Sequence, residues 1–226
     1  MKTYQELIEL SKTFGLRFTL DRIGNHEFLK LSNHWHPFSM TEQEGRIVYD
    51  YIIQNNLRNG FEIATAFGVS SSVIGQALKI TNGKLVTMDS YIEEHFGNSS
   101  EYTTNDRETI SPENSDCYKM ANKLIENLGL SEIVKLEVGW SPEDNTEIIK
   151  KHFDCKLDFC FIDGGHTPEQ IDKDVRSLMK HMGEKAVMFF HDYIHMGQST
   201  KTFLYDVGFG EAEYLGTNFD LVIHKR

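Results

Sequence analysis

Residues 157–193 read LDFCFIDGGHTPEQIDKDVRSLMKHMGEKAVMFFHDY, and this stretch decides the fold. Its two ends, 157–163 and 185–192, are nearly continuous apolar runs, which is typical of strands that are covered on both faces. The segment between them has helical periodicity. A strand, a helix and a second strand joined by short connections predict two parallel strands in the middle of an α/β sheet.

The same alternation of strand and helix extends in both directions from this stretch. Further strand candidates are GFEIAT (60–65), KLVTMD (84–89) and IVKLEV (133–138), and two C-terminal runs at 212–217 and 219–225 resemble a closing hairpin. We therefore predict a doubly wound, mostly parallel seven-stranded sheet that is flanked by helices and has an antiparallel C-terminal hairpin strand. In such sheets, ligands bind beyond the carboxyl ends of the strands.

The length of 226 residues suits one α/β domain. We expect residues 1–40 to form an N-terminal helical arm that packs on the core, and residues 41–226 to form a single α/β domain. Cys117, Cys155 and Cys160 show no CxxC or zinc-finger spacing, so we expect reduced thiols.

The charge balance restricts the partners of this chain. Lys and Arg total 23 and Asp and Glu total 34, which gives a net charge of −11. This acidity argues against a nucleic-acid backbone or an anionic membrane as the main partner. No apolar run approaches 18 residues and no export signal is recognisable at the N-terminus, so we expect a cytoplasmic protein.

A turn of small residues follows the first strand candidate. Residues 62–71 read EIATAFGVSS, an acidic residue followed by small side chains at alternate positions. Small side chains let the backbone approach a ligand closely, and Ser70 or Ser71 is expected to cap the next helix. Only Gly68 remains of three positions where glycine is typical of nucleotide-binding turns. Simple packing of a strand against a helix explains the same residues equally well.

The second strand candidate ends in Asp89, about twenty residues beyond that turn. An acidic residue there can accept hydrogen bonds from both hydroxyls of a ribose. The alternative is an Asp that caps the following segment. Together, the turn and Asp89 favour a cofactor that contains a nucleoside.

Carboxylates also follow the fourth and fifth strand candidates. Asp163 is followed by Gly164, Gly165 and His166, and Asp192 lies between His191 and a tyrosine. Two carboxylates at the tips of adjacent strands can share an octahedral divalent cation. Alternatively, each Asp caps the helix that follows it, and His191 is a core histidine.

These motifs, taken in order, resemble a known family. The order EIATAFG, VTMD, VGWSPED, FIDGGHTPEQIDKDV and FFHDY is similar to that of the class I S-adenosylmethionine-dependent methyltransferases. The similarity is greatest to the metal-dependent O-methyltransferase branch with the catechol-type and macrolide-sugar enzymes, and it covers about residues 38–226. It implies a Rossmann-like methyltransferase fold, S-adenosylmethionine as cofactor and a small-molecule acceptor with hydroxyl groups. The resemblance leaves open whether the protein forms a homodimer.

The resemblance also implies roles for individual residues. The end of the first strand and its turn would face the methionine part of the cofactor, the acid after the second strand its ribose, and the loop after the third strand its adenine. The cofactor-binding residues implied in this way are Glu62, Ala64, Thr65, Ala66, Gly68, Ser70, Ser71, Asp89, Ser90, Trp140, Ser141 and Asp163. The implied metal ligands, for Mg²⁺ or another divalent cation, are Asp163, Asp192 and His191. For His191, a role as a partner of a ligand or as a residue of the core is equally open.

This chain departs from the family pattern at two positions. Some relatives have a basic Asp where this chain has Gly165, and catechol-type relatives have a Lys where it has His166. Methyl transfer to a hydroxyl needs an oxygen that is partly deprotonated, and an imidazole with a pKa near 6.5 suits that task. We therefore predict His166 as the base and Asp163 as its catalytic partner.

Three alternatives remain beside a metal-dependent O-methyltransferase. The enzyme could work without a metal or methylate nitrogen, or the domain could be non-catalytic with a degenerate cofactor turn. A nicotinamide dehydrogenase is disfavoured because FIDGGH and FHDY have no role in one. The connection 93–116 carries seven acidic residues against Arg107, and either a lid or a solvated loop explains it.

Overall fold

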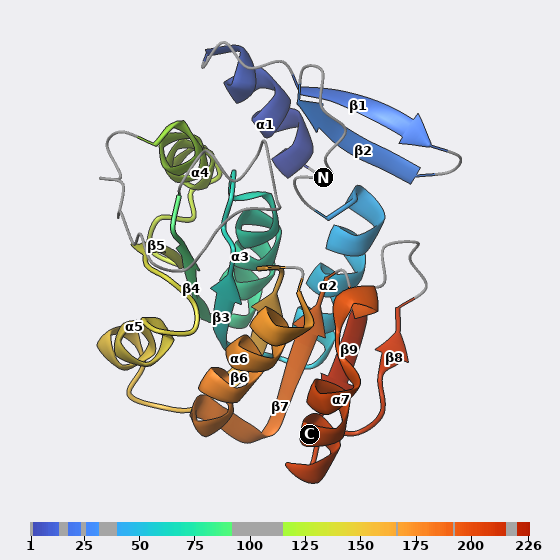
Figure 1. Ribbon diagram of the computed structural model, residues 1–226. Coiled ribbons are helices and arrows are strands. Elements are labelled where there is room, and N and C mark those ends of the chain that lie inside the picture. Colours follow the sequence, from blue (N-terminus) through green and yellow to red (C-terminus); the bar gives the residue numbers. More distant parts are fainter. Residues whose placement is uncertain are drawn as a thin grey trace.

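The computed structural model describes residues 2–13, 18–23, 26–31, 40–91, 115–165, 167–191, 193–215 and 221–226. Within them, a seven-stranded sheet lies between two layers of helices (Figure 1). Its strands follow the order β5-β4-β3-β6-β7-β9-β8. Their bounds are β3 (Asn59–Ile63), β4 (Lys84–Asp89), β5 (Val134–Val138), β6 (Leu157–Ile162), β7 (Met182–Phe190), β8 (Glu213–Tyr214) and β9 (Val222–Lys225). The strands β3 to β7 pair in parallel and β8 and β9 pair antiparallel, so the predicted fold class is confirmed.

The two apolar runs that decide the fold are neighbours in the middle of the sheet. β6 pairs with β7 in parallel, with Phe161 opposite Phe189 and Ile162 opposite Phe190. Successive residues of a strand point to opposite faces, so both faces of these strands need a cover. Phe161 belongs to the core on one face and Ile162 to the core on the other. This double burial explains why both runs are continuously apolar.

Helices cover both faces of the sheet (Figure 1). One layer consists of α1 (Lys2–Thr13), α2 (Glu42–Gln54), α3 (Val69–Thr81) and α4 (Asp116–Asn127), and the other of α5 (Asn145–His152), α6 (Pro168–Leu178) and α7 (Gln198–Asp206). Short 3₁₀ turns lie at Met179–His181 and Tyr193–His195. In the described part of the chain, no helix has the length and apolar composition to cross a membrane.

The N-terminal part contains more than the predicted helix. α1 buries Tyr4, Leu7 and Leu10 in the core that it shares with α2, α3 and α4. It is followed by an antiparallel hairpin, β1 (Phe18–Ile23) and β2 (His26–Leu31), which was not predicted. The Gly-Asn dipeptide between these strands in the sequence is a hairpin signal that could have found it. The division of the chain at residue 40 stays a prediction.

Candidate functional site

The predicted site residues gather at the carboxyl ends of the parallel strands. Ala64 follows β3, Asp89 ends β4, Trp140 follows β5, Asp163 follows β6 and His191 follows β7. β3 lies between β4 and β6. From β3, the chain first adds β4 and β5 on one side of the sheet and then adds β6 and β7 on the other side. This is the topological switch point at which doubly wound sheets bind ligands.

The turn after β3 keeps the backbone that glycines would adopt. Ala64, Ala66 and Gly68 have φ values of 76°, 45° and 79°, all in the left-handed region. That conformation costs an L-residue about 1–2 kcal/mol, and glycine far less. At Gly68, a Cβ would lie 3.0 Å from Cα and Cβ of Ala121, so only glycine fits without a shift. The alanines therefore change the sequence of the turn and not its shape.

The expectation that Ser70 or Ser71 caps the following helix is wrong. α3 begins after Gly68 in the left-handed conformation, and no side chain caps it. Both serines lie inside its first turn and are buried. The Ser71 hydroxyl instead donates to the carboxylate of Glu62, because a buried carboxylate needs hydrogen-bond donors.

Glu62 is fully buried in β3 at the head of this turn. Burial raises the pKa of its carboxyl to about 7, although the hydroxyls of Ser70, Ser71 and Thr87 act in the opposite direction. Its Oε1 accepts no hydrogen bond from the described residues. The turn thus begins at a buried acid with one free acceptor.

Asp89 ties the turn to the end of β4. Its Oδ2 accepts a hydrogen bond from the Ala66 amide at 2.8 Å, and its Oδ1 accepts one from the Tyr91 amide at 2.8 Å. An acidic residue at the end of this strand is of the type that accepts hydrogen bonds from a ribose diol. Tyr91 is buried and packs edge-to-face on Tyr118 at 5.1 Å. Ser90, between Asp89 and Tyr91 in the sequence, is half-buried.

The loop after β5 is held by a buried acid that the sequence analysis missed. The Ser141 hydroxyl donates to Oδ1 of Asp174, and the Gln170 amide donates to Oδ1 at 2.8 Å and to the Ser141 carbonyl at 2.9 Å. Asp174 lies on α6, and burial raises its pKa to about 6. Its place on the apolar face of α6, between Ile171 and Val175, is the sequence signal that could have found it.

The tips of β6 and β7 join through His191. Its Nδ1 lies 3.1 Å from Oδ1 of Asp163, so the predicted neighbourhood of these two residues is confirmed. On the other side of the ring, Nε2 lies 3.5 Å from Oε2 of Glu44 in α2. The side chains of His191 and Glu44 are 2% and 0% exposed, whereas that of Asp163 is 15% exposed.

Glu44 is the second residue that the sequence analysis missed. It forms a capping box with Thr41, whose amide donates to Oε2 of Glu44 at 2.7 Å while the Glu44 amide donates to the Thr41 hydroxyl at 3.2 Å. Burial acts to raise the pKa of Glu44, but its interactions with His191 and Thr41 outweigh it and lower the pKa. The T-x-x-E spacing predicts such a cap and gives no sign of His191.

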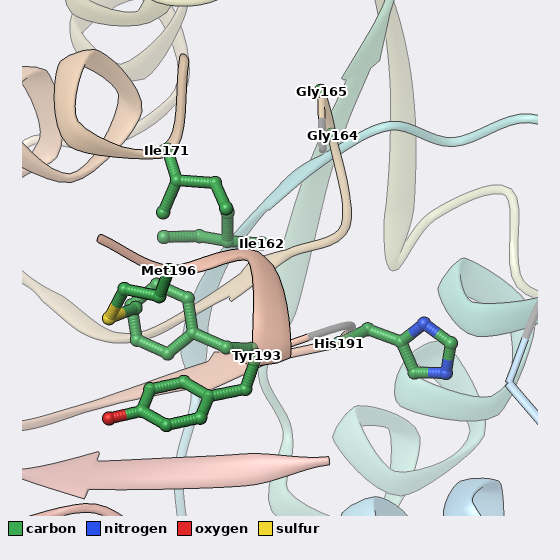
Figure 2. A pocket seen from close by; sticks show the side chains of 8 residues that line it. Ile162, Gly164, Gly165, Ile171, His191, Tyr193 and Met196 are labelled. Atoms are coloured by element: carbon green, nitrogen blue, oxygen red, sulfur yellow. The ribbon is translucent and has the colours of Figure 1, made fainter. Parts of the chain in front are cut away.

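A small hollow lies beside these strand tips. It is lined by Ile162, Gly164, Gly165, Ile171, Phe190, His191, Tyr193 and Met196. Figure 2 shows the His191 ring pointing away from the side chains of Ile171, Tyr193 and Met196. The side of the hollow away from His191 is therefore mainly apolar.

Two predicted residues, His166 and Asp192, lie outside the described residues, as does most of the acidic connection at 92–114. Among the residues that the structure does describe, no three His, Cys, Asp or Glu side chains form a group that could hold a metal ion. Asp163 offers a partly exposed carboxylate, the ligand type that Mg²⁺ prefers. Both nitrogens of His191 face carboxylates, so its ring does not fit a ligand role.

Comparison with known families gives one match. A family model described as a methyltransferase domain matches residues 61–193, which include the turn after β3 and the tips of β6 and β7. A search of curated proteins finds no match to this sequence.

Several solved structures share this architecture. The O-methyltransferase from Bacillus cereus in complex with SAH is 14% identical, with a TM-score of 0.64 over 100% of this chain and 90% of that one. Cofactor-bound Rv0187 from MTB is 13% identical, with a TM-score of 0.60 over 100% and 89%. The O-methyltransferase TomG from Streptomyces achromogenes, in complex with SAM, is 15% identical, with a TM-score of 0.57 over 86% and 66%. At these identities, the likeness establishes the fold.

Proposed function

The chain belongs to the methyltransferase family whose model matches residues 61–193, as a class I S-adenosylmethionine-dependent enzyme, and we propose that it methylates a hydroxyl of a small molecule. The observation that carries this proposal is the turn after β3. Two alanines hold the left-handed backbone of a glycine turn there, and Asp89 anchors it. A domain that had lost its cofactor would have no need of this costly conformation.

The turn and its surroundings suit each part of the cofactor. The free Oε1 of Glu62 offers an acceptor to an ammonium group or a bound water. The carboxylate of Asp89 at the end of β4 suits the ribose hydroxyls, and the loop at Trp140 and Ser141 would flank the adenine. The remaining cofactor contacts that we propose come from Ala64, Thr65, Ala66, Gly68, Ser70, Ser71, Ser90 and Asp163.

We further propose that Asp163 and Asp192 hold a divalent cation, most simply Mg²⁺. A bound cation would lower the pKa of an acceptor hydroxyl. Asp163 supports this because its carboxylate is partly exposed at a strand tip. His191 was predicted as a third ligand, but both its nitrogens face carboxylates, and we now assign it to holding Asp163 in place.

His166 is the proposed base. It would take the proton of the acceptor hydroxyl while the oxygen attacks the sulfonium methyl, so that a C–O bond forms and the C–S bond breaks. The products are a methyl ether, S-adenosylhomocysteine and the proton on His166. Location in the cytoplasm stays a prediction.

Replacing His166 by Ala tests this assignment. With a panel of catechol-type and sugar acceptors, we expect turnover to fall by about 100-fold or more, the usual share of a general base. The Kd for S-adenosylhomocysteine, measured by calorimetry, should stay within about threefold because His166 acts on the acceptor. Unchanged turnover would remove His166 from the mechanism, and absent binding of the cofactor product would reject the function itself.

A further inference from the structure

A buried imidazole lies between two carboxylates that come from distant parts of the chain. His191 follows β7, Asp163 follows β6, and Glu44 belongs to α2 on one face of the sheet. The ring nitrogens lie 3.1 Å from Asp163 and 3.5 Å from Glu44. Charged side chains are almost never fully buried unless they are paired, so these contacts need a reason.

Helix capping alone does not explain Glu44. A capping box asks only for an acceptor that reaches back to the backbone of Thr41, and burial of that acceptor is no part of it. Here the Glu44 side chain is 0% exposed, and its Oε1 accepts no hydrogen bond from the described residues. Burying a carboxylate in this way is unfavourable unless polar partners surround it, and the imidazole of His191 faces it.

We propose that Glu44 is a positioning residue of the methyl-transfer site, which acts on Asp163 through His191. Its carboxylate holds the ring from the α2 side, so that Nδ1 faces Asp163 and fixes the direction of that carboxylate. Asp163 then presents its other oxygen at the strand tip. This inference rests on the proposed function of Asp163, and Glu44 itself does not contact the reacting groups.

The chain offers variants that separate this role from capping. Glu44→Gln keeps the capping box, which accepts Glu or Gln, and removes only the charge that faces His191. Thr41→Ala is the control for capping, because it removes the hydroxyl that accepts from the Glu44 amide and donates to Oε2 of Glu44 at 2.9 Å, and it keeps the Glu44 carboxylate itself. Glu44→Asp keeps the charge on a shorter side chain, and it replaces Glu44→Gln if that variant unfolds.

The first measurement needs neither metal nor substrate. Nuclear magnetic resonance of the ring N–H protons of His191, assigned with His191→Asn, reports on each side of the ring separately. We expect Glu44→Gln to shift the Nδ1 signal, which belongs to the side that faces Asp163, and Thr41→Ala to shift it less, because the Glu44 carboxylate is kept in that variant. An unchanged Nδ1 signal in Glu44→Gln would overturn the proposal, as would an equal shift in both variants.

The second measurement is the affinity for Mn²⁺, a spectroscopic substitute for Mg²⁺. Loss of a partner that orients a metal ligand typically weakens metal binding by about 10–100-fold, and we expect a loss in this range in Glu44→Gln. The Kd for S-adenosylhomocysteine should change by less than about threefold in the same variant. If the unmodified protein binds no Mn²⁺, the metal part of the proposed function fails, and the Nδ1 signal still decides the role of Glu44.

Discussion

The turn after β3 and the tips of β6 and β7 are held in different ways. In the turn, alanine stands at two positions where glycine is typical, yet Ala64 and Ala66 keep the left-handed backbone. At the strand tips, Asp163 lies beside His191, and His191 lies beside Glu44, a residue from a helix more than a hundred residues away in the sequence.

The difference shows which properties a local sequence can determine. Backbone conformation at one residue is a local property, and an alanine can adopt a glycine conformation for about 1–2 kcal/mol. The partner of a buried side chain is a tertiary property, which depends on the helix that packs over it. A turn that lacks two typical glycines can therefore keep their backbone conformation, whereas the partners of a strand-end motif cannot be inferred from the motif itself.

Asp163→Ala should give the largest effect, on the side of the strand tips. Loss of the carboxylate should lower turnover by about 1,000-fold, since cation and base support commonly contribute at this scale. The affinity for S-adenosylhomocysteine should fall far less, because the turn after β3 and Asp89 stay intact. Steady-state kinetics with a Mg²⁺ titration, together with calorimetry, measure both. Equal losses of turnover and affinity would mean that the strand tips bind the cofactor as much as the turn does, and that the two regions do not have separate functions.

Glu62→Gln should give the next largest effect, on the side of the turn. The pKa of Glu62 is raised from 4.5 to about 7 in the folded protein, so its contribution to stability is fully present below about pH 4.5 and is lost as the pH rises through 7. A shift of this size corresponds to about 3 kcal/mol of unfolding free energy. Urea denaturation from pH 5 to 8 should show that fall in the unmodified protein and a flatter profile in Glu62→Gln.

Asp174→Asn is the companion variant for that experiment. Its raised pKa of about 6 places its loss of stability at lower pH, between about 4 and 6. The two variants should therefore flatten different parts of the profile. If both profiles match that of the unmodified protein, neither acid has the raised pKa from which the fall in stability follows.

Much of the fold could be predicted from the sequence because its signals are local. The apolar runs at 157–163 and 185–192 predicted adjacent central strands, and β6 and β7 are paired. The hairpin of β1 and β2 was missed because its strands are short and mix charged with apolar residues. Its dipeptide signal was the only clear indication.

The site could be predicted in part. The positions of Asp163 and His191 after two neighbouring strands predicted that they lie close together, because parallel strands end at the same edge of a sheet, and the structure places them in contact. It could not find Glu44, because the spacing of a capping box looks the same whether the helix end is exposed or buried. The serines after β3 were misassigned as caps for a related reason, since the buried acid that one of them satisfies lies on a preceding strand.

Glycine substitutions in the turn should give the smallest effect and test the comparison most directly. Ala77→Gly in the middle of α3 should lower the unfolding free energy by about 1 kcal/mol or more, as glycine does in a helix. Ala64→Gly and Ala66→Gly relieve a left-handed alanine, which offsets the entropy cost of glycine, so each should stay within about 1 kcal/mol of the unmodified protein or exceed it. Their affinity for S-adenosylhomocysteine should be equal or higher because the backbone is free to approach the ligand. Urea denaturation and calorimetry of the three variants provide the test.

A loss in Ala64→Gly or Ala66→Gly as large as that in Ala77→Gly would mean that the turn does not hold the glycine conformation in solution. The contrast with the strand tips would then disappear.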